Sequence, residues 1–122
     1  MRDRLTLAQI ALLCMYAALM AGGQLLFKAA ALRLAGDAPL AERLVGLAQN
    51  WMFIAAIALY FSLSFLWVWI LSFTPLSRAY PFMALAFAIT PVLGAFVFAE
   101  PMTLRLGIGL AVILCGLILV AG

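Results

Sequence analysis

The residues best suited to chemistry lie on one face of the first apolar segment. Ala17, Ala21, Gln24 and Lys28 recur at positions i, i+4, i+7 and i+11, which places them within about 60° on a helix. This face is a stripe of small side chains that ends in an amide and an ammonium. We predict that Lys28 binds an anionic group such as a phosphate and that Gln24 hydrogen-bonds a polar part of the same ligand. In the alternative interpretation, Lys28 only extends to the lipid headgroups at the membrane surface.

Arg78, Tyr80 and Pro81 form a second candidate cluster further along the chain. Tyr80 combines an aromatic ring with a hydroxyl, which suits a sugar or a lipid headgroup. Pro81 is expected in the first turn of a helix, where its missing N–H costs no hydrogen bond, and it is a candidate hinge. Arg78 either binds substrate or, as we favour, is an interfacial arginine held by phosphate headgroups.

Glu100 and Pro91 are singled out by charge and by backbone chemistry. Glu100 precedes the last apolar segment, where it is expected to pair with Lys28 or Arg105, or to interact with the N-terminus of the following helix. Recognition of a substrate amine is the alternative role for its carboxylate. Pro91 removes one backbone hydrogen bond inside a helix, so it is expected to produce a kink and is a second candidate hinge.

The last apolar segment also carries regularly spaced small residues. Gly107, Ala111 and Cys115 recur every four residues, and Gly109 and Gly116 lie seven apart on a neighbouring face. In lipid, small side chains let helix backbones approach closely, which substitutes for the missing hydrophobic driving force. We predict a dimer interface at these glycines and Ala111, with packing inside the chain as the alternative.

Most of the 122-residue chain consists of the apolar segments that must position these side chains. Hydrophobic residues make up 70% of it and charged residues 9%, far from the composition of a soluble domain. Four segments each supply the roughly 20 apolar residues that a helix needs to cross hydrocarbon. We predict an all-α membrane protein whose residues 1–122 form a single domain. Its four transmembrane helices are predicted at Thr6–Leu34, Trp51–Phe73, Tyr80–Phe98 and Met102–Val120.

The connections between these helices are predicted to differ in length. Arg33–Asn50 is long, and Pro39–Val45 within it is expected to lie in the membrane interface as a short amphipathic turn. The third and fourth helices are joined by Ala99–Pro101, so they should form an antiparallel hairpin. The first segment is too long for the apolar region of a signal peptide and runs into Lys28, so we expect it to be retained.

The composition argues against catalysis. The chain has no histidine, which removes the usual general base and the commonest metal ligand. Cys14 and Cys115 fall inside apolar helices far apart in the sequence, which favours neither a metal site nor a disulfide. Asp3, Asp37 and Glu42 fall in connecting segments. We therefore predict a protein that is not an enzyme and that needs no cofactor.

Basic residues are balanced between the two ends of the predicted bundle. The side with both termini holds Arg2, Arg4 and Arg78, and the other holds Arg33, Arg43 and Arg105, with Lys28 near it. The bias that usually orients a membrane protein is therefore close to zero. Insertion in both orientations with head-to-tail pairing, orientation by a partner subunit, and one orientation set by weak local signals all fit this balance.

Several motifs resemble the drug/metabolite transporter superfamily. They are Ala21–Lys28 (AGGQLLFK), Thr74–Pro81 (TPLSRAYP), Glu100-Pro101, and the pair Gly109 and Gly116. More narrowly, the chain resembles the four-helix EamA-like flippase subunits that move 4-amino-4-deoxy-L-arabinose-phosphoundecaprenol across the bacterial inner membrane. The resemblance implies a polyprenyl-phosphate-linked sugar as substrate, contact with membrane lipids, and a homodimer or a heterodimer with a similar small subunit. It implies no nucleic-acid partner.

The chain is also similar to the small multidrug resistance exporters, but it departs from them at one position. Those exporters carry an essential glutamate in the first helix about two turns before the lysine, whereas Met20 stands there in this sequence. Without a carboxylate, a buried cation has no partner to offset its desolvation. We therefore rank a flippase for a lipid-linked amino sugar above a small-molecule or cation exporter. A non-transporting scaffold subunit is the remaining alternative.

Overall fold

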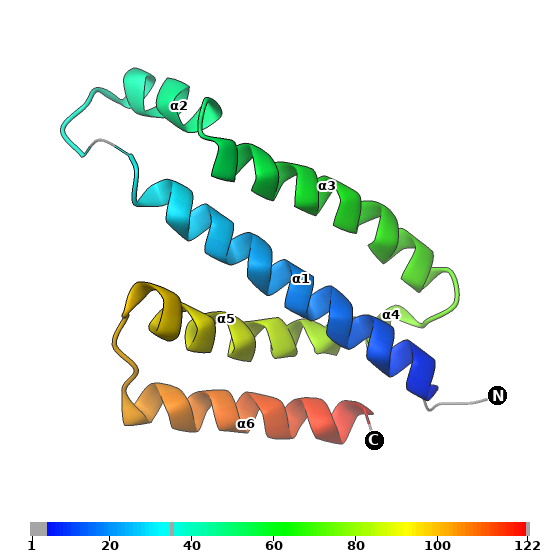
Figure 1. The fold of residues 1–122 in the computed structure, drawn as a ribbon. Helices are drawn as coiled ribbons and strands as arrows, with labels where there is room; N and C mark the ends of the chain where they lie inside the picture. Colours follow the sequence, from blue (N-terminus) through cyan, green and yellow to red (C-terminus); the bar gives the residue numbers. More distant parts are fainter. Residues whose placement is uncertain (1–4, 35, 122) are drawn as a thin grey trace.

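A computed structural model describes residues 5–34 and 36–121, and the elements within these ranges are helical (Figure 1). They are α1 (Leu7–Ala31), α2 (Leu40–Ala48), α3 (Trp51–Leu71), α4 (Leu76–Ala79), the 3₁₀ turn η1 (Tyr80–Phe82), α5 (Met83–Phe98) and α6 (Leu104–Ala121). Among the described residues, four helical segments are long and apolar enough to cross a membrane: α1, α3, Leu76–Phe98 and α6. The predicted all-α, four-span architecture is confirmed. Arg2, Asp3 and Arg4 lie outside the described residues.

Side chains at two helix starts supply the hydrogen bonds that the first turn lacks. At α1, the Thr6 hydroxyl accepts from the Gln9 N–H at 3.2 Å, and the Gln9 side-chain oxygen accepts from the Thr6 N–H at 2.8 Å. At α3, the Asn50 side chain accepts from the Met52 N–H at 2.9 Å. These caps fix where the helices begin, because the first four N–H groups of a helix have no partner within it.

The third span differs from its prediction at its start. Helix begins at Leu76, directly after Pro75, rather than at Tyr80. Pro81 lies in the first turn of the 3₁₀ element η1, between α4 and α5, but not in the first turn of the whole span. A proline cannot donate to the carbonyl four residues earlier, and the backbone tightens locally into a 3₁₀ turn. The predicted turn at Pro39–Val45 is likewise a longer element, the nine-residue α2.

The helix α1 is the centre of the arrangement, with α3 on one side and α5 on the other (Figure 1). The helices α1 and α5 run in the same direction, and α6 returns antiparallel to α5. The predicted hairpin of the last two spans is therefore confirmed. The helix α6 packs mainly against α5 and η1, so it lies at the outer edge of the fold.

Small side chains allow α1 to be approached from both sides. Ala17 and Ala21 have no exposed surface, and Gly23 is buried as well. Within the first half of α1, the Tyr16 ring packs against the Trp67 ring with a centroid separation of 5.0 Å. Since the hydrophobic effect does not pull helices together in lipid, this close contact is the source of their association.

Polar contacts at the end of the fold where α1 begins and α6 ends fix how far the helices are shifted along one another. The Gln9 side-chain amide donates to the Phe73 carbonyl and to the Thr74 hydroxyl, both at 3.1 Å. Arg78 donates from Nη1 to the Val120 carbonyl at 2.8 Å, which satisfies one of the last carbonyls of α6. These bonds tie α1 and α6 to the chain that connects α3 with α5.

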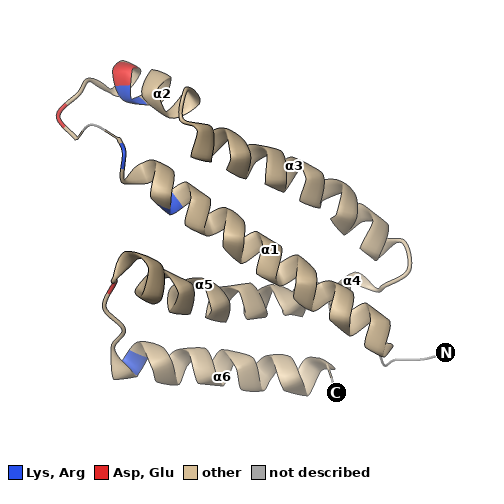
Figure 2. Cartoon of the chain, in the orientation of Figure 1, with Lys and Arg blue, Asp and Glu red and all other residues tan. Residues whose placement is uncertain are grey.

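Charged residues gather at the opposite end, around the α1–α2 connection and the α5–α6 turn (Figure 2). They are Lys28, Arg33, Asp37, Glu42, Arg43, Glu100 and Arg105. Charged side chains at a span's boundary can reach the headgroup region. Arg33, Arg43 and Arg105 thus lie at the same end of the bundle, which confirms the predicted grouping.

We expect Ala17→Leu to destabilise the fold by about 1–3 kcal/mol, because three added carbons must fit where α1 touches its neighbours. The matched control is Ala18→Leu, since Ala18 is the next residue of the same helix and is exposed. Chemical unfolding in detergent, followed by circular dichroism, compares the two variants. Equal stabilities for both variants would contradict the central position of α1.

Candidate functional site

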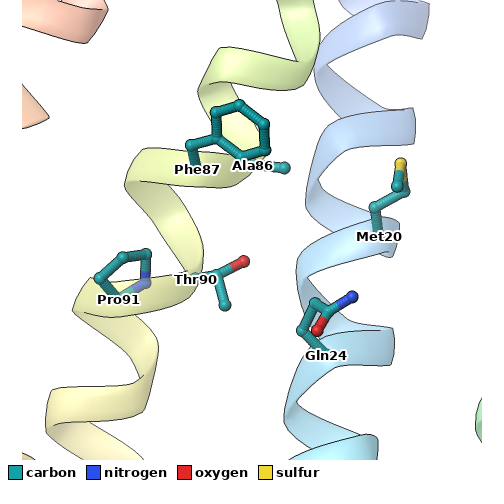
Figure 3. A pocket seen from close by; sticks show the side chains of 6 residues that line it. All are labelled: Met20, Gln24, Ala86, Phe87, Thr90 and Pro91. Atoms are coloured by element: carbon teal, nitrogen blue, oxygen red, sulfur yellow. The ribbon is translucent and has the colours of Figure 1, made fainter.

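A pocket of about 420 Å³ lies between α1 and α5 (Figure 3). It is lined by Met20, Gln24, Ala86, Phe87, Thr90 and Pro91. The Gln24 amide and the Thr90 hydroxyl bring polar atoms into an otherwise apolar wall, and both lie between the two helices. Few polar groups in a largely apolar cavity of this size are typical of small-molecule sites.

Tyr60 on α3 fixes how Gln24 presents its amide. The Gln24 Nε2 donates to the Tyr60 hydroxyl at 2.9 Å, and that hydroxyl donates to the Met20 carbonyl at 2.8 Å. Because the nitrogen is bonded toward α3, the Gln24 Oε1 lies on the α5 side of the amide (Figure 3). An amide oxygen accepts hydrogen bonds only, so the pocket offers an acceptor to a hydroxyl or an ammonium.

The second glycine of the AGGQ motif makes this arrangement possible. A Cβ atom at Gly23 would lie 2.7 to 2.9 Å from three ring and hydroxyl atoms of Tyr60. The Phe27 ring stacks on the Tyr60 ring with a centroid separation of 5.3 Å. By contrast, no atom outside the local helix lies within 4 Å of a Cβ at Gly22. The missing side chain of Gly23 therefore leaves room for the Tyr60 ring, and the Tyr60 hydroxyl in turn orients the Gln24 amide.

Lys28 and Glu100 form an ion pair one turn further along α1. The Lys28 Nζ lies 3.1 Å from the Glu100 Oε2. Lys28 is four residues after Gln24, which places it about 6 Å further along the same helical face. Of the partners predicted for Glu100, the structure selects Lys28, because the α5–α6 turn lies beside the end of α1 (Figure 1).

The structure leaves the second predicted cluster far from this site. Arg78 and Tyr80 lie at the other end of the spans, in α4 and η1. Arg78 binds the end of α6, and the Tyr80 ring packs edge-on against Trp67 at 6.4 Å. Within one chain, therefore, Lys28, Gln24 and Glu100 come together, and Arg78 and Tyr80 do not join them.

Two other predicted features fall at distinct places. Pro91 lines the pocket inside α5, which continues through it. On α6, no atom outside the local helix lies within 4 Å of a Cβ at Gly107, Gly109 or Gly116, and Ala111 is exposed. These small residues thus leave an open surface on the outer helix, and the dimer interface stays a prediction.

Sequence reasoning missed Tyr60 and Thr90. Tyr60 lies in the middle of a predicted span, where a hydroxyl needs a hydrogen-bond partner, and that signal could have marked it. Thr90 directly precedes Pro91, and no pattern in the sequence distinguishes its hydroxyl from the other polar groups of the spans. Neither residue has a spacing that links it to Gln24, because the three lie on different helices.

The chain is similar to bacterial proteins that share the name "probable 4-amino-4-deoxy-L-arabinose-phosphoundecaprenol flippase subunit ArnE". It is 39% identical to the Enterobacter sp. protein over 57 residues, which cover 47% of this chain and 53% of that protein. It is 31% identical to the Proteus mirabilis protein over 71 residues, covering 58% and 62%. It is 32% identical to the Sodalis glossinidius protein over 94 residues, covering 77% and 79%.

The match thus spans about half the length of the Enterobacter protein and about four fifths of the Sodalis protein. No family model matches the chain, and no solved structure matches it.

We expect Gly23→Ala to displace the Tyr60 ring and to destabilise the protein by about 1–3 kcal/mol, because the new methyl group overlaps that ring. Gly22→Ala is the matched control and should change stability by less than about 0.5 kcal/mol. Unfolding in detergent measures both stabilities. If the two variants are equally stable, Tyr60 does not pack on Gly23 as described.

Proposed function

The chain belongs to the family of 4-amino-4-deoxy-L-arabinose-phosphoundecaprenol flippase subunits, and we propose that it moves a polyprenyl-phosphate-linked amino sugar across the bacterial inner membrane. The observation that carries the proposal is the convergence of polar groups on one pocket within apolar spans. Polar side chains at membrane depth are costly and therefore mark substrate pathways. The proposed activity is transport rather than catalysis.

Lys28 and Gln24 are the proposed ligands of the headgroup. Lys28 lies in the last turn of α1, near the membrane surface, and its ammonium binds the phosphate there. One turn deeper, the Gln24 Oε1 and the Thr90 hydroxyl bind sugar hydroxyls. The volume of about 420 Å³ suits a single sugar unit, and the polyprenyl chain stays in the bilayer.

The chain is proposed to act as a single four-helix unit, residues 1–122, in a dimer with a second copy or with a similar small subunit. The exposed small residues of α6 support a helix-to-helix contact there. In a head-to-tail pair, Arg78 and Tyr80 of one copy would lie on the same side as Lys28 of the other. A phosphate could then be bound at either membrane face, while Pro91 and Pro81 act as hinges.

Lys28→Gln is expected to weaken binding of a polyprenyl-phosphate amino sugar by about 10- to 100-fold, the loss of one charge-assisted hydrogen bond of about 1.5–3 kcal/mol. Arg33→Gln removes a cation from the same end of α1 and should change the affinity by less than about threefold. Tryptophan fluorescence of the protein in lipid nanodiscs follows both titrations.

A parallel titration with hydrophobic cations separates the other classes of function. Saturable cation binding that Lys28→Gln leaves unchanged, without binding of the phospholipid sugar, would favour an exporter. Binding of neither ligand, with the α6 contact intact, would favour a scaffold subunit.

A further inference from the structure

The Lys28–Glu100 ion pair lies across one end of the groove between α1 and α5. Both helices run in the same direction, so Lys28 follows Gln24 by one turn on α1 and Gly94 follows Thr90 by one turn on α5. Glu100 reaches back over Gly94, and its partner Lys28 completes the bridge between the helices. A headgroup that enters the pocket from this membrane surface therefore meets the pair.

The backbone holds the Glu100 carboxylate in this place. Ala99 has φ 55°, in the left-handed region, which ends α5 and turns the chain back. A Cβ atom at Gly94 would lie 2.9 Å from the Glu100 Oε1, so the carboxylate lies directly against the α5 backbone. The side chains of Lys28 and Glu100 are still 43% and 44% exposed, so a ligand can reach both charges.

The neutrality of the pair restricts what can replace it. A phosphate that takes Lys28 alone would leave the Glu100 carboxylate unpaired and next to a second anion. A cation that takes Glu100 alone would leave Lys28 unpaired. Both outcomes are unfavourable, because the partner left behind loses its attraction to the opposite charge, and a phosphate would also be repelled by the Glu100 carboxylate. A ligand with a phosphate and an ammonium replaces both partners together.

We propose that the Lys28–Glu100 pair opens around a zwitterionic lipid headgroup, in which Lys28 binds the phosphate and Glu100 binds a primary ammonium. Glu100 then selects the headgroup with a charged amine over derivatives in which the amine is no longer charged. This inference rests on the proposed function, since it requires Lys28 to bind phosphate. Two lipids share the required chemistry: a polyprenyl-phosphate amino sugar and the bilayer lipid phosphatidylethanolamine.

The test compares a polyprenyl-phosphate amino sugar with the same lipid after N-acetylation, which removes the positive charge. The full chain is placed in nanodiscs of phosphatidylglycerol, which has no amine, and tryptophan fluorescence gives the two affinities. We expect the wild type to prefer the free amine by about tenfold or more. Glu100→Gln should reduce this preference to less than about twofold, and Lys28→Gln should weaken both ligands.

Three further variants separate a specific effect on binding from a loss of folding. Glu100→Asp keeps the carboxylate and should restore part of the preference for the free amine. Gly94→Ala keeps Glu100 but displaces it, so the preference should fall, whereas Gly22→Ala, where a Cβ meets no atom within 4 Å, should leave it unchanged. Circular dichroism of each variant reports its helical content.

The outcomes distinguish this inference from the function beneath it. If the wild type binds both lipids equally, or if Glu100→Gln keeps the preference, the pair does not select the amine, although the flippase proposal stands. If neither lipid binds, the proposed function fails first. Adding phosphatidylethanolamine separates the two sources: competition in the wild type but not in Glu100→Gln identifies the bilayer lipid as an occupant, and its absence identifies the lipid-linked sugar.

Discussion

Close approach of helices to α1 from two sides is the constraint on which the other features depend. In lipid, apolar surfaces gain nothing by leaving the solvent, so helices associate where backbones can come near. Ala17, Ala21 and Gly23 provide such places on α1. Contact with α3 brings Tyr60 to Gln24, and contact with α5 forms the pocket. A bulky residue at any of these positions would disturb the packing around α1.

The polar groups of the fold are arranged at three depths along α1. Gln9 binds the α3–α4 connection at one end, Gln24 binds Tyr60 at an intermediate depth, and Lys28 binds Glu100 at the other end. Each contact joins α1 to a segment distant in the sequence. The same bonds that align the helices therefore also define the proposed path of a headgroup, from the Lys28–Glu100 pair to the Gln24 amide.

The pocket also bears on the choice between flippase and exporter. Met20 lines it at the position where the small multidrug exporters carry a carboxylate. A thioether offers no charge to a cation, whereas the amide and hydroxyl beside it suit a sugar. The Glu100 carboxylate lies against Gly94, one turn beyond Thr90, and is already paired with Lys28. This arrangement favours a ligand that carries its own pair of charges.

The spans and the polar faces of the helices follow directly from the amino-acid sequence. Apolar segments of this length must be helical in lipid, because a helix satisfies its own backbone hydrogen bonds, and the 3.6-residue period then puts Gln24 and Lys28 on one face. The 3₁₀ turn at Pro81 and the full length of α2 are local departures that this pattern did not reveal.

Which helix faces contact one another is seen only in the tertiary structure. Gln24 and Tyr60 are 36 residues apart, and their contact depends on α3 lying beside α1. The choice of Lys28 over Arg105 as partner of Glu100, and of Gly23 over Gly22 as the seat of Tyr60, has the same origin. Nearly every face of these helices is apolar, so periodicity cannot rank neighbours. Their order follows from how closely particular side chains let the backbones approach.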